Sequence, residues 1–388
     1  MKYFEFFNPV KICAGEDAVS HLNYELNSLG VNNPLILTDQ SLIKLGLVKK
    51  VIKLSEIKSY NICADIPVDS GVKVVNKILT YLQEKNCDGI IAIGGGSVID
   101  TAKGVKMAYA RTNDLKKIMG LEVIKKAKEL PFIVLPTTAG TGSECTNVAV
   151  IKDEESDIKM EFITPYLMPN VAIIDPILTE TLPPKISAST GFDALVHAIE
   201  GYTCLQKNLI SDAYALTSIK LLVENIEKVC TSPKDKDARL NMAIGSTLAG
   251  LCFGNSMVGA VHAIGHSLGG VCHIAHGDAM TILLPYVMEF NKSKLFKEYA
   301  SLLNIFEKEI PINLNVEQKC DLVINKIIEL REKLNKLADL PISLTQTNKY
   351  DSMYLDEIVQ NALNDGAMLV NPVALSKDDV IQILNKAK

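Results

Sequence analysis

The sequence predicts two domains: an N-terminal α/β domain built on a mostly parallel sheet, and a C-terminal domain made of helices. The chain has 388 residues, more than one ordinary hydrophobic core holds. Strand-like apolar runs alternate with helical patterns up to the diproline Pro183-Pro184, as in βαβ units. After the diproline no strand-like run of comparable quality appears. We therefore expect an α/β domain over residues 1–182 and an all-α domain over residues 183–388.

The composition excludes several classes of protein. With 48% hydrophobic and 22% charged residues, the chain is globular rather than disordered. No apolar run reaches the roughly 18 residues of a membrane-spanning helix, and the N-terminus lacks the layout of a secretory signal. Nine cysteines without a C-x-x-C pair suit reduced thiols, and a net charge of -5 gives no support for nucleic acid or membrane as partner. We expect a soluble cytoplasmic protein.

Apolar patterning predicts the elements of the first domain in chain order. Helical spacing covers residues 17–29, and a second helix is expected from a cap at Ser70 to Glu84. Continuous apolar runs are typical of buried parallel strands. Strands are expected at residues 35–38, 59–63, 89–93, 132–135 and 171–174, with a β-ribbon formed by residues 148–152 and 159–163.

Two glycine-rich turns follow strands of this sheet. The strand at 89–93 enters GGGSVIDTAK at Gly94, where glycines let a ligand approach the backbone and a helix opens at Ser97. The strand at 132–135 enters PTTAGTGS at Pro136. Either turn alone is also explained by packing. Because parallel strands end at one edge of the sheet, we expect the two turns to lie side by side and form a dinucleotide cleft.

Asp39 ends the strand at 35–38 and is a candidate for cofactor selectivity. A carboxylate there accepts hydrogen bonds from a ribose 2′-hydroxyl and repels a 2′-phosphate. The alternative is an ordinary loop aspartate or a helix cap.

Amphipathic patterns predict the helices of the second domain. A first helix, capped by Ser189-Thr190, contains Asp193 and Tyr202. Further helices are expected at residues 212–229, 238–252, 316–337, 356–363 and 377–386.

The stretch at residues 261–277, VHAIGHSLGGVCHIAHG, is the strongest candidate for a metal site. It contains four of the six histidines, namely His262, His266, His273 and His276. Histidine is the commonest metal ligand, and a spacing of four places His262 and His266 on the same face of a helix. Gly269 and Gly270 are expected to break that helix, so that a turn returns the later pair of histidines.

Asp193 and His197 are spaced one helical turn apart among apolar neighbours. A buried aspartate is costly unless it is paired or bound to a cation, and a satisfied Asp–His ion pair is the alternative interpretation. Together with His262 and His276, these residues complete a four-ligand site of one carboxylate and three imidazoles. Such donors without thiolate suit Fe(II) or Zn(II) rather than calcium or magnesium.

These motifs together resemble the iron-dependent (group III) alcohol dehydrogenase family, which includes lactaldehyde reductases, 1,3-propanediol dehydrogenases and butanol dehydrogenases. The resemblance covers nearly the whole chain. It is carried by GGGSVIDTAK at Gly94, PTTAGTGSE at Pro136, AIIDPILTETLPP at Ala172, STGFDALVHAIEGY at Ser189, and FGNSMVGAVHAIGHSLGG leading to AHGDA. It implies a Rossmann-like N-terminal domain, a helical C-terminal domain, and an active cleft between them.

The resemblance also implies roles for individual residues. The family's metal ligands fall on Asp193, His197, His262 and His276. His266 matches a histidine beside the substrate and is the candidate catalytic residue. The cofactor phosphates fall on Gly95, Gly96, Ser97, Thr137, Thr138 and Thr141. Asp100 and Lys159 match positions near the nicotinamide and ribose, Leu178 an adenosine contact, and Asp39 the position that favours NAD over NADP.

The implied activity is reversible hydride transfer between NAD(H) and a small primary alcohol, diol or aldehyde, with Fe²⁺ or Zn²⁺ as Lewis acid on the substrate oxygen. Family members commonly form homodimers or larger homo-oligomers. One alternative is an enzyme of the dehydroquinate synthase or glycerol dehydrogenase branch. Another is a non-catalytic nucleotide-binding sensor with a structural metal.

Overall fold

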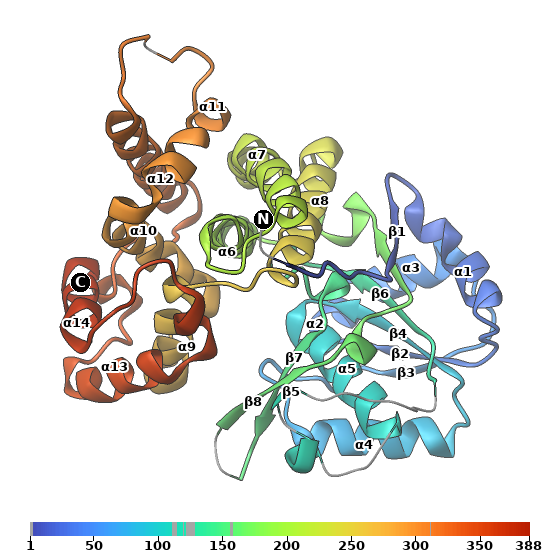
Figure 1. The fold of residues 1–388 in the computed structure, drawn as a ribbon. Helices are drawn as coiled ribbons and strands as arrows, with labels where there is room; N and C mark the ends of the chain where they lie inside the picture. The colour runs from blue at the N-terminus through green and yellow to red at the C-terminus, as the bar shows by residue number, and fades with distance from the viewer. Residues whose placement is uncertain (1–2, 111–114, 119, 122–128, 156–157, 311) are drawn as a thin grey trace. The chain divides into compact units, whose positions relative to one another are not determined.

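The computed structural model describes residues 3–110, 115–118, 120–121, 129–155, 158–310 and 312–388 (Figure 1). The chain forms two compact units. One comprises Asn8–Thr181, and the other comprises Leu182–Lys388 together with Met1–Phe7. The first is an α/β unit and the second is a helical unit, as the sequence predicts.

A six-stranded parallel sheet is the centre of the α/β unit, with the strand order β1-β9-β6-β4-β2-β3. Its strands are β1 (Lys11–Ala14), β2 (Pro34–Leu37), β3 (Asn61–Cys63), β4 (Gly89–Gly94), β6 (Phe132–Pro136) and β9 (Val171–Ile174). A second sheet joins the antiparallel strands β7 (Val148–Asp153) and β8 (Ile158–Ile163) to the short β5 (Gly120–Leu121). The expected ribbon is therefore confirmed.

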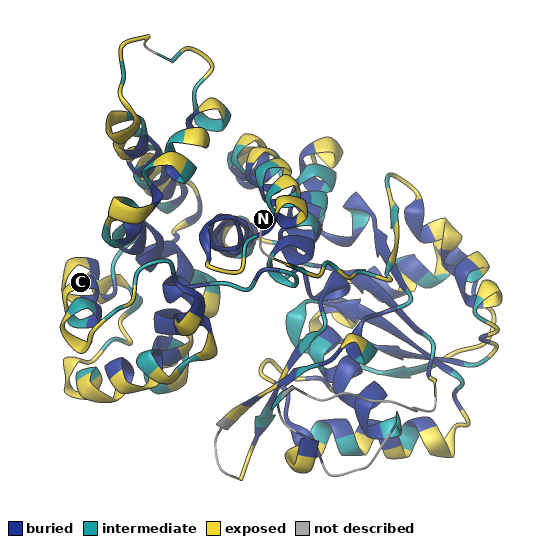
Figure 2. Cartoon of the chain, in the orientation of Figure 1, coloured by how far each residue is buried: buried dark blue, intermediate teal, exposed yellow. Residues whose placement is uncertain are grey.

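Alternating side chains of the central strands build a core on each face of the main sheet. Ile90 and Ala92 face one core together with residues of α4 (Val72–Glu84) and α5 (Gly96–Ala110). Ile91 and Ile93 face the other core, which α1 (Leu22–Ser28) and α3 (Leu47–Ser55) complete. The central strands are consequently buried throughout, which explains their continuous apolar sequences (Figure 2).

The strand order changes direction at β2, which has β3 on one side and β4 on the other. In open parallel sheets, ligands bind at such a switch point, outside the carboxyl ends of the strands. Asp39 follows β2, the first glycine-rich turn follows β4, and the second follows β6. Asp39 and the two glycine-rich turns thus emerge from three neighbouring strand ends.

Helices make up the second unit, and α6 (Pro184–Thr203) is its most buried helix (Figure 2). Apolar residues surround α6 on most sides, so it packs against α7, α8 and α10 at once. Helix α9 packs against α10 and α13. The remaining helices are α7 (Leu209–Thr231), α8 (Lys236–Phe253), α9 (Ala260–Cys272), α10 (His276–Ser301), α11 (Leu303–Phe306), α12 (Val316–Ala338), α13 (Leu355–Asn364) and α14 (Lys377–Ala387). Helix α2 (Gln40–Lys44) belongs to the α/β unit.

Three local predictions are wrong. Gly71 rather than Ser70 is the N-cap of α4, and α6 begins at Pro184, so Ser189-Thr190 lies inside it. Helix α9 does not break at its glycines but continues to Cys272, and His273 ends it in the left-handed conformation. A helical glycine costs only about 1 kcal/mol, which the packing of α9 against its neighbours outweighs. Among the described residues, no helix is long and apolar enough to cross a bilayer.

Candidate metal centre and cofactor-binding turns

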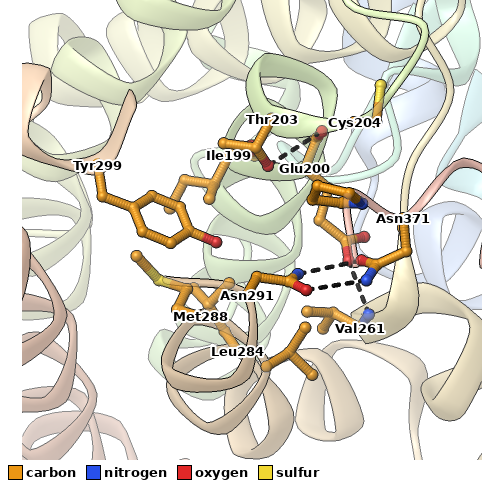
Figure 3. Close-up of a pocket in the computed structure, with 13 residues that line it drawn as sticks. Ile199, Glu200, Thr203, Cys204, Val261, Leu284, Met288, Asn291, Tyr299 and Asn371 are labelled. Atoms are coloured by element: carbon orange, nitrogen blue, oxygen red, sulfur yellow. Dashed lines mark hydrogen bonds between the residues drawn. The ribbon is translucent and has the colours of Figure 1, made fainter. Parts of the chain in front are cut away.

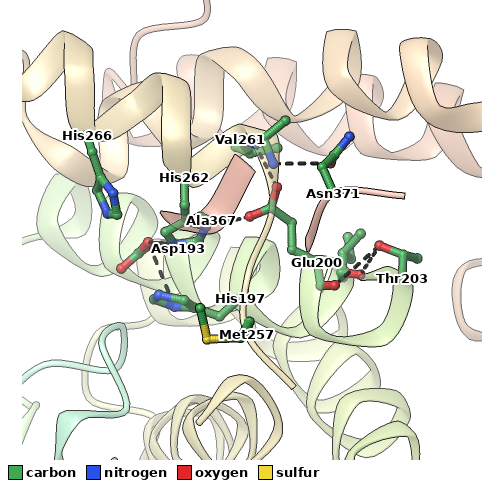
Figure 4. Close-up of polar contacts among 12 residues, drawn as sticks. Asp193, His197, Glu200, Thr203, Met257, Val261, His262, His266, Ala367 and Asn371 are labelled. Atoms are coloured by element: carbon green, nitrogen blue, oxygen red, sulfur yellow. Dashed lines mark hydrogen bonds and ion pairs between the residues drawn. The ribbon is translucent and has the colours of Figure 1, made fainter. Parts of the chain in front are cut away.

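Four side chains of the helical unit converge on one point: Asp193, His197, His262 and His276. One donor atom from each of them lies within 4.8 Å of the others. Asp193 Oδ1 is central, at 3.9 Å from His197 Nδ1, 3.8 Å from His262 Nε2 and 3.3 Å from His276 Nε2. Figure 4 shows Asp193 with His197 and His262 turned towards it. The sequence-predicted group is therefore brought together.

Three helices place these ligands. Asp193 and His197 are one turn apart on α6, His262 is in the first turn of α9, and His276 is the first residue of α10. Gly277 lets the start of α10 approach α6 closely, because a Cβ at this position would lie 2.6 Å from the Ser189 carbonyl oxygen. The close packing of α10 against α6 therefore explains why a glycine, Gly277, follows the ligand His276.

The cluster has the electrostatics of a cation site. His197 Nδ1 and His262 Nε2 are buried and make no hydrogen bond within the described part of the chain. Burial lowers the pKa of His197 to about 3 and the pKa of His262 well below its usual value, so both imidazoles are neutral and carry a lone pair. Burial opposes ionisation of Asp193, but the neighbouring His197 and His276 hold its pKa below the usual range. A metal ion satisfies all of these atoms.

His266 lies beside this cluster but is not part of it. Its ring is stacked on that of His276, with centroids 5.5 Å apart, and its Nδ1 lies 2.9 Å from Asp365 Oδ2. The His266 side chain is 37% exposed, whereas that of His262 is only 3% exposed. His266 is therefore within reach of solvent and of a ligand at the cluster.

The two glycine-rich turns of the α/β unit lie against each other, as expected. The amide of Thr137 donates to the Gly94 carbonyl oxygen at 3.0 Å. A Cβ on Gly95 would lie 3.1 Å from Thr138 Cγ2, and a Cβ on Gly96 would lie 2.9 Å from Thr141 Cγ2. The glycines therefore allow a close approach of the turns, and the N-terminus of α5 opens between them. Free N–H groups and a positive dipole end make such a helix start suitable for phosphate.

A buried polar network lies beneath these turns. Asp100 accepts hydrogen bonds from Ser143 Oγ (2.7 Å) and from the amide of Val150 (3.0 Å). Lys103 Nζ donates to the same Ser143 Oγ and to Thr146 Oγ1, each at 3.0 Å. Burial lowers the pKa of Lys103 to about 8. In this structure Asp100 connects α5 to the second turn and to β7.

The other predicted cofactor residues occupy different surroundings. Asp39 caps α2, since its Oδ1 accepts from the amides of Ser41 and Leu42. Asp39 is therefore a helix cap, which was the alternative interpretation of this residue. The two capping hydrogen bonds use Oδ1 and not Oδ2. Lys159 forms an ion pair with Asp69 at 2.9 Å. Leu178 is 1% exposed and belongs to the core beneath the sheet.

Sequence reasoning assigned no role to three polar residues that lie beside the turns or the metal cluster: Lys103, Glu200 and Asp365. Lys103 stands in the GGGSVIDTAK motif, but its helical position alone did not reveal burial. Glu200 follows Asp193 by seven residues and therefore shares its helix face, which was an available signal. Asp365 lies far from His266 in sequence, so only the fold brings them together.

The fold and these sites define a class of protein: a metal-dependent oxidoreductase that pairs a dinucleotide-type α/β unit with a helical metal-binding unit. The chain belongs to the iron-containing alcohol dehydrogenase family. Residues 9–176 match the family described as iron-containing alcohol dehydrogenase, and residues 187–388 match its C-terminal family. The expected family, fold and enzyme class are thereby confirmed.

Individual relatives cover the full chain. It is 30% identical over 391 residues to the NAD-dependent methanol dehydrogenase of Bacillus methanolicus, covering 98% of this chain and 99% of that protein. It is 32% identical over 388 residues to the NADPH-dependent butanol dehydrogenase of Clostridium saccharobutylicum, covering 97% and 96%. The crystal structure of a 1,3-propanediol oxidoreductase superposes with a TM-score of 0.95 at 29% identity, covering 100% of both chains.

Proposed function

We propose that the protein interconverts a small primary alcohol or diol and its aldehyde with NAD(H), using a metal held by Asp193, His197, His262 and His276. One carboxylate and three imidazoles converge, and two of the imidazoles have buried nitrogens without a hydrogen-bond partner among the described residues; this convergence carries the proposal. Nitrogen and oxygen donors without thiolate suit Fe²⁺, with Zn²⁺ as the alternative. Family membership supports the reaction class.

When bound, the metal supplies Lewis acidity to the substrate oxygen. The chain's own residues provide the rest. The buried ligands Asp193, His197 and His262 close one side of the site, and the 43% exposed side chain of His276 leaves the other side accessible. His266 borders this accessible side, where it is placed to take the alcohol proton during oxidation and return it during reduction. Its hydrogen bond with Asp365 fixes the orientation of the ring.

In this proposal the cofactor phosphates rest on the turn formed by Gly95, Gly96 and Ser97, with Thr137, Thr138 and Thr141 beside them. Asp100 and Lys159 complete the proposed cofactor set near the nicotinamide and ribose, and Leu178 supports the adenosine side from the core. The packing of the two turns and the position of Asp39 at the switch point support this arrangement.

Asp39 is expected to favour NAD(H) through its charge. Asp39→Asn keeps an oxygen that caps α2 but removes the repulsion of a 2′-phosphate, so kcat/KM for NADPH relative to NADH is expected to rise about tenfold. Asp39→Ala is the matched control, because it also removes the cap and should cost about 1 kcal/mol of stability. Steady-state kinetics with both cofactors give kcat/KM for NADPH relative to NADH in each variant. An unchanged preference in both variants would show that Asp39 is only a helix cap.

The proposed activity is tested by following NADH absorbance with propanal, butanal and 3-hydroxypropanal, in Fe(II) and in Zn(II) under anaerobic conditions. Turnover of an unbranched aldehyde, and NAD⁺ reduction by the matching alcohol, are expected. An enzyme that turns over no aldehyde, alcohol or diol but binds NADH would favour the sensor interpretation.

We also propose a cytoplasmic location and a homodimer or larger homo-oligomer. The nine cysteines are all free in the structure, which supports a reducing compartment. Light scattering coupled to size-exclusion chromatography gives the mass in solution, and a mass equal to that of a single 42.4 kDa chain at micromolar concentration would contradict the oligomer.

A further inference from the structure

Glu200 lies directly behind one of the proposed metal ligands. It follows His197 on α6 and is 5% exposed. Its Oε2 lies 2.6 Å from His262 Nδ1, while His262 Nε2 faces Asp193 at 3.8 Å. The two nitrogens of this imidazole therefore have different surroundings: one faces a carboxylate of α6, and the other faces the metal cluster (Figure 4).

The carboxylate of Glu200 is itself fixed by the start of α9. Its Oε1 accepts from the amide of Val261 at 2.7 Å. A Cβ on Gly259 would lie 3.0 Å from this same oxygen, so glycine at the N-cap lets the carboxylate reach the helix end. Glu200 thus satisfies a free N–H group of α9 from a neighbouring helix.

A second side chain caps the same helix end without touching His262. Asn371 Oδ1 accepts from the amide of Ala260 at 3.1 Å. Asn371 also forms a reciprocal amide pair with Asn291, at 2.9 and 3.1 Å (Figure 3). A small cavity of about 10 Å³, room for one water molecule, lies beside Glu200 and this pair. Glu200 and Asn371 therefore share the capping of α9, but only Glu200 contacts a proposed ligand.

We propose that Glu200 is the positioning residue of the metal centre, which keeps the proton of His262 on Nδ1 and the Nε2 lone pair directed at the metal. The inference rests on the proposed function, because it assigns a role in holding the same metal. When the Glu200 carboxylate is ionised it only accepts hydrogen bonds, so its partner nitrogen is then the donor. In a neutral imidazole the other nitrogen is then free to coordinate. Carboxylates that orient a ligating histidine in this way typically contribute 10- to 100-fold to metal affinity.

Glutamine at position 200 has nearly the same shape as glutamate but cannot accept hydrogen bonds from both the Val261 amide and His262 Nδ1. If its oxygen accepts from Val261, its NH₂ group faces His262 Nδ1 and drives the proton to Nε2, which removes the lone pair. If its oxygen faces His262, the NH₂ group opposes the amide of Val261. Glu200→Gln is therefore the sharpest variant, since either orientation loses one of the two hydrogen bonds that Glu200 accepts, from the Val261 amide or from His262 Nδ1.

The experiment compares the metal-free full-length wild type, Glu200→Gln and Asn371→Ala by chelator competition with Zn²⁺. We expect Glu200→Gln to bind Zn²⁺ about 10- to 100-fold more weakly. Asn371→Ala, which weakens the same helix end but leaves His262 untouched, is expected to stay within about threefold of the wild type. Equal losses in both variants would mean that Glu200 acts only by holding α9, and equal affinity in wild type and Glu200→Gln would refute the role outright.

A second measurement does not depend on how the variant folds. Imidazole ¹⁵N spectra of the metal-free wild type at pH 8, labelled in its six histidines, report the tautomer of His262. The assignment uses the signal that disappears in His262→Gln. We expect the proton on Nδ1, and a proton on Nε2 with Glu200 intact would overturn the inference. Absence of Zn²⁺ and Fe²⁺ binding by the wild type would instead contradict the proposed function, so the two failures are distinguishable.

Discussion

His262→Ala is expected to abolish metal binding and to lower alcohol oxidation by a hundredfold or more, whereas His266→Ala keeps its metal. The two histidines are one turn apart on α9, so the substitutions are closely matched. His262 supplies a buried Nε2 to the cluster, while Nδ1 of His266 is engaged with Asp365. Loss of a Lewis acid removes several kcal/mol of catalysis, at about 1.4 kcal/mol per tenfold in rate.

For His266→Ala we expect bound iron close to that of the wild type and a kcat lower by about a hundredfold, the contribution typical of general acid–base catalysis. Metal content by plasma mass spectrometry and kcat with the preferred alcohol are the two readouts, and circular dichroism checks folding. Full metal content and full activity in His262→Ala would exclude His262 as a ligand.

Gly96→Val is expected to weaken NADH binding by about ten- to hundredfold. A Cβ at this position meets Thr141 Cγ2 at 2.9 Å, and the branched side chain would also occupy the opening at the N-terminus of α5. A ten- to hundredfold loss of affinity corresponds to about 1.4–2.8 kcal/mol of binding free energy. Enhancement of NADH fluorescence measures the dissociation constant, because the chain has no tryptophan whose emission NADH could quench.

Gly104→Ala is the control for this variant. Gly104 lies on the same helix and packs against Ile151, away from the turn. The substitution should lower the melting temperature but leave the affinity of the folded protein for NADH unchanged. If Gly96→Val bound NADH as tightly as Gly104→Ala does, the first glycine-rich turn would not be the phosphate site.

The sequence predicts five of the six strands of the main sheet and most of the helices because each carries its own periodic signal. It did not predict the edge strand β1, which is largely exposed and lacks a continuous apolar run, or α10. The continuous apolar run at β4 and the alternation of its side chains between two cores are local properties of the chain. The ends of the helices were harder to predict. Ser189-Thr190 has the composition of a cap, yet α6 begins at Pro184, because proline suits the first helical position and packing buries most of the helix from Ser187 onward.

The ligand cluster was also accessible from sequence, since its spacing and a matching family pattern both indicate it. The residues that surround the ligands could not be predicted from the sequence. Glu200 contacts His262 from 62 positions away, and His266 is separated from Asp365 by 99. Such contacts depend on how the helices pack. A glutamate or aspartate in the sequence can be a surface charge or the hydrogen-bond partner of a metal ligand, and its residue type alone does not distinguish the two.

We propose that the cluster on α6, α9 and α10 binds the catalytic metal. The most direct test is an anaerobic titration of metal-free wild type with Fe(II), in which NADH oxidation by butanal is followed against the iron bound per chain. We expect the metal-free protein to bind NADH but to be inactive. The rate should rise in proportion to the iron bound and level off at one equivalent per chain, as expected for a single cluster. Full turnover by protein shown to be free of metal would contradict it.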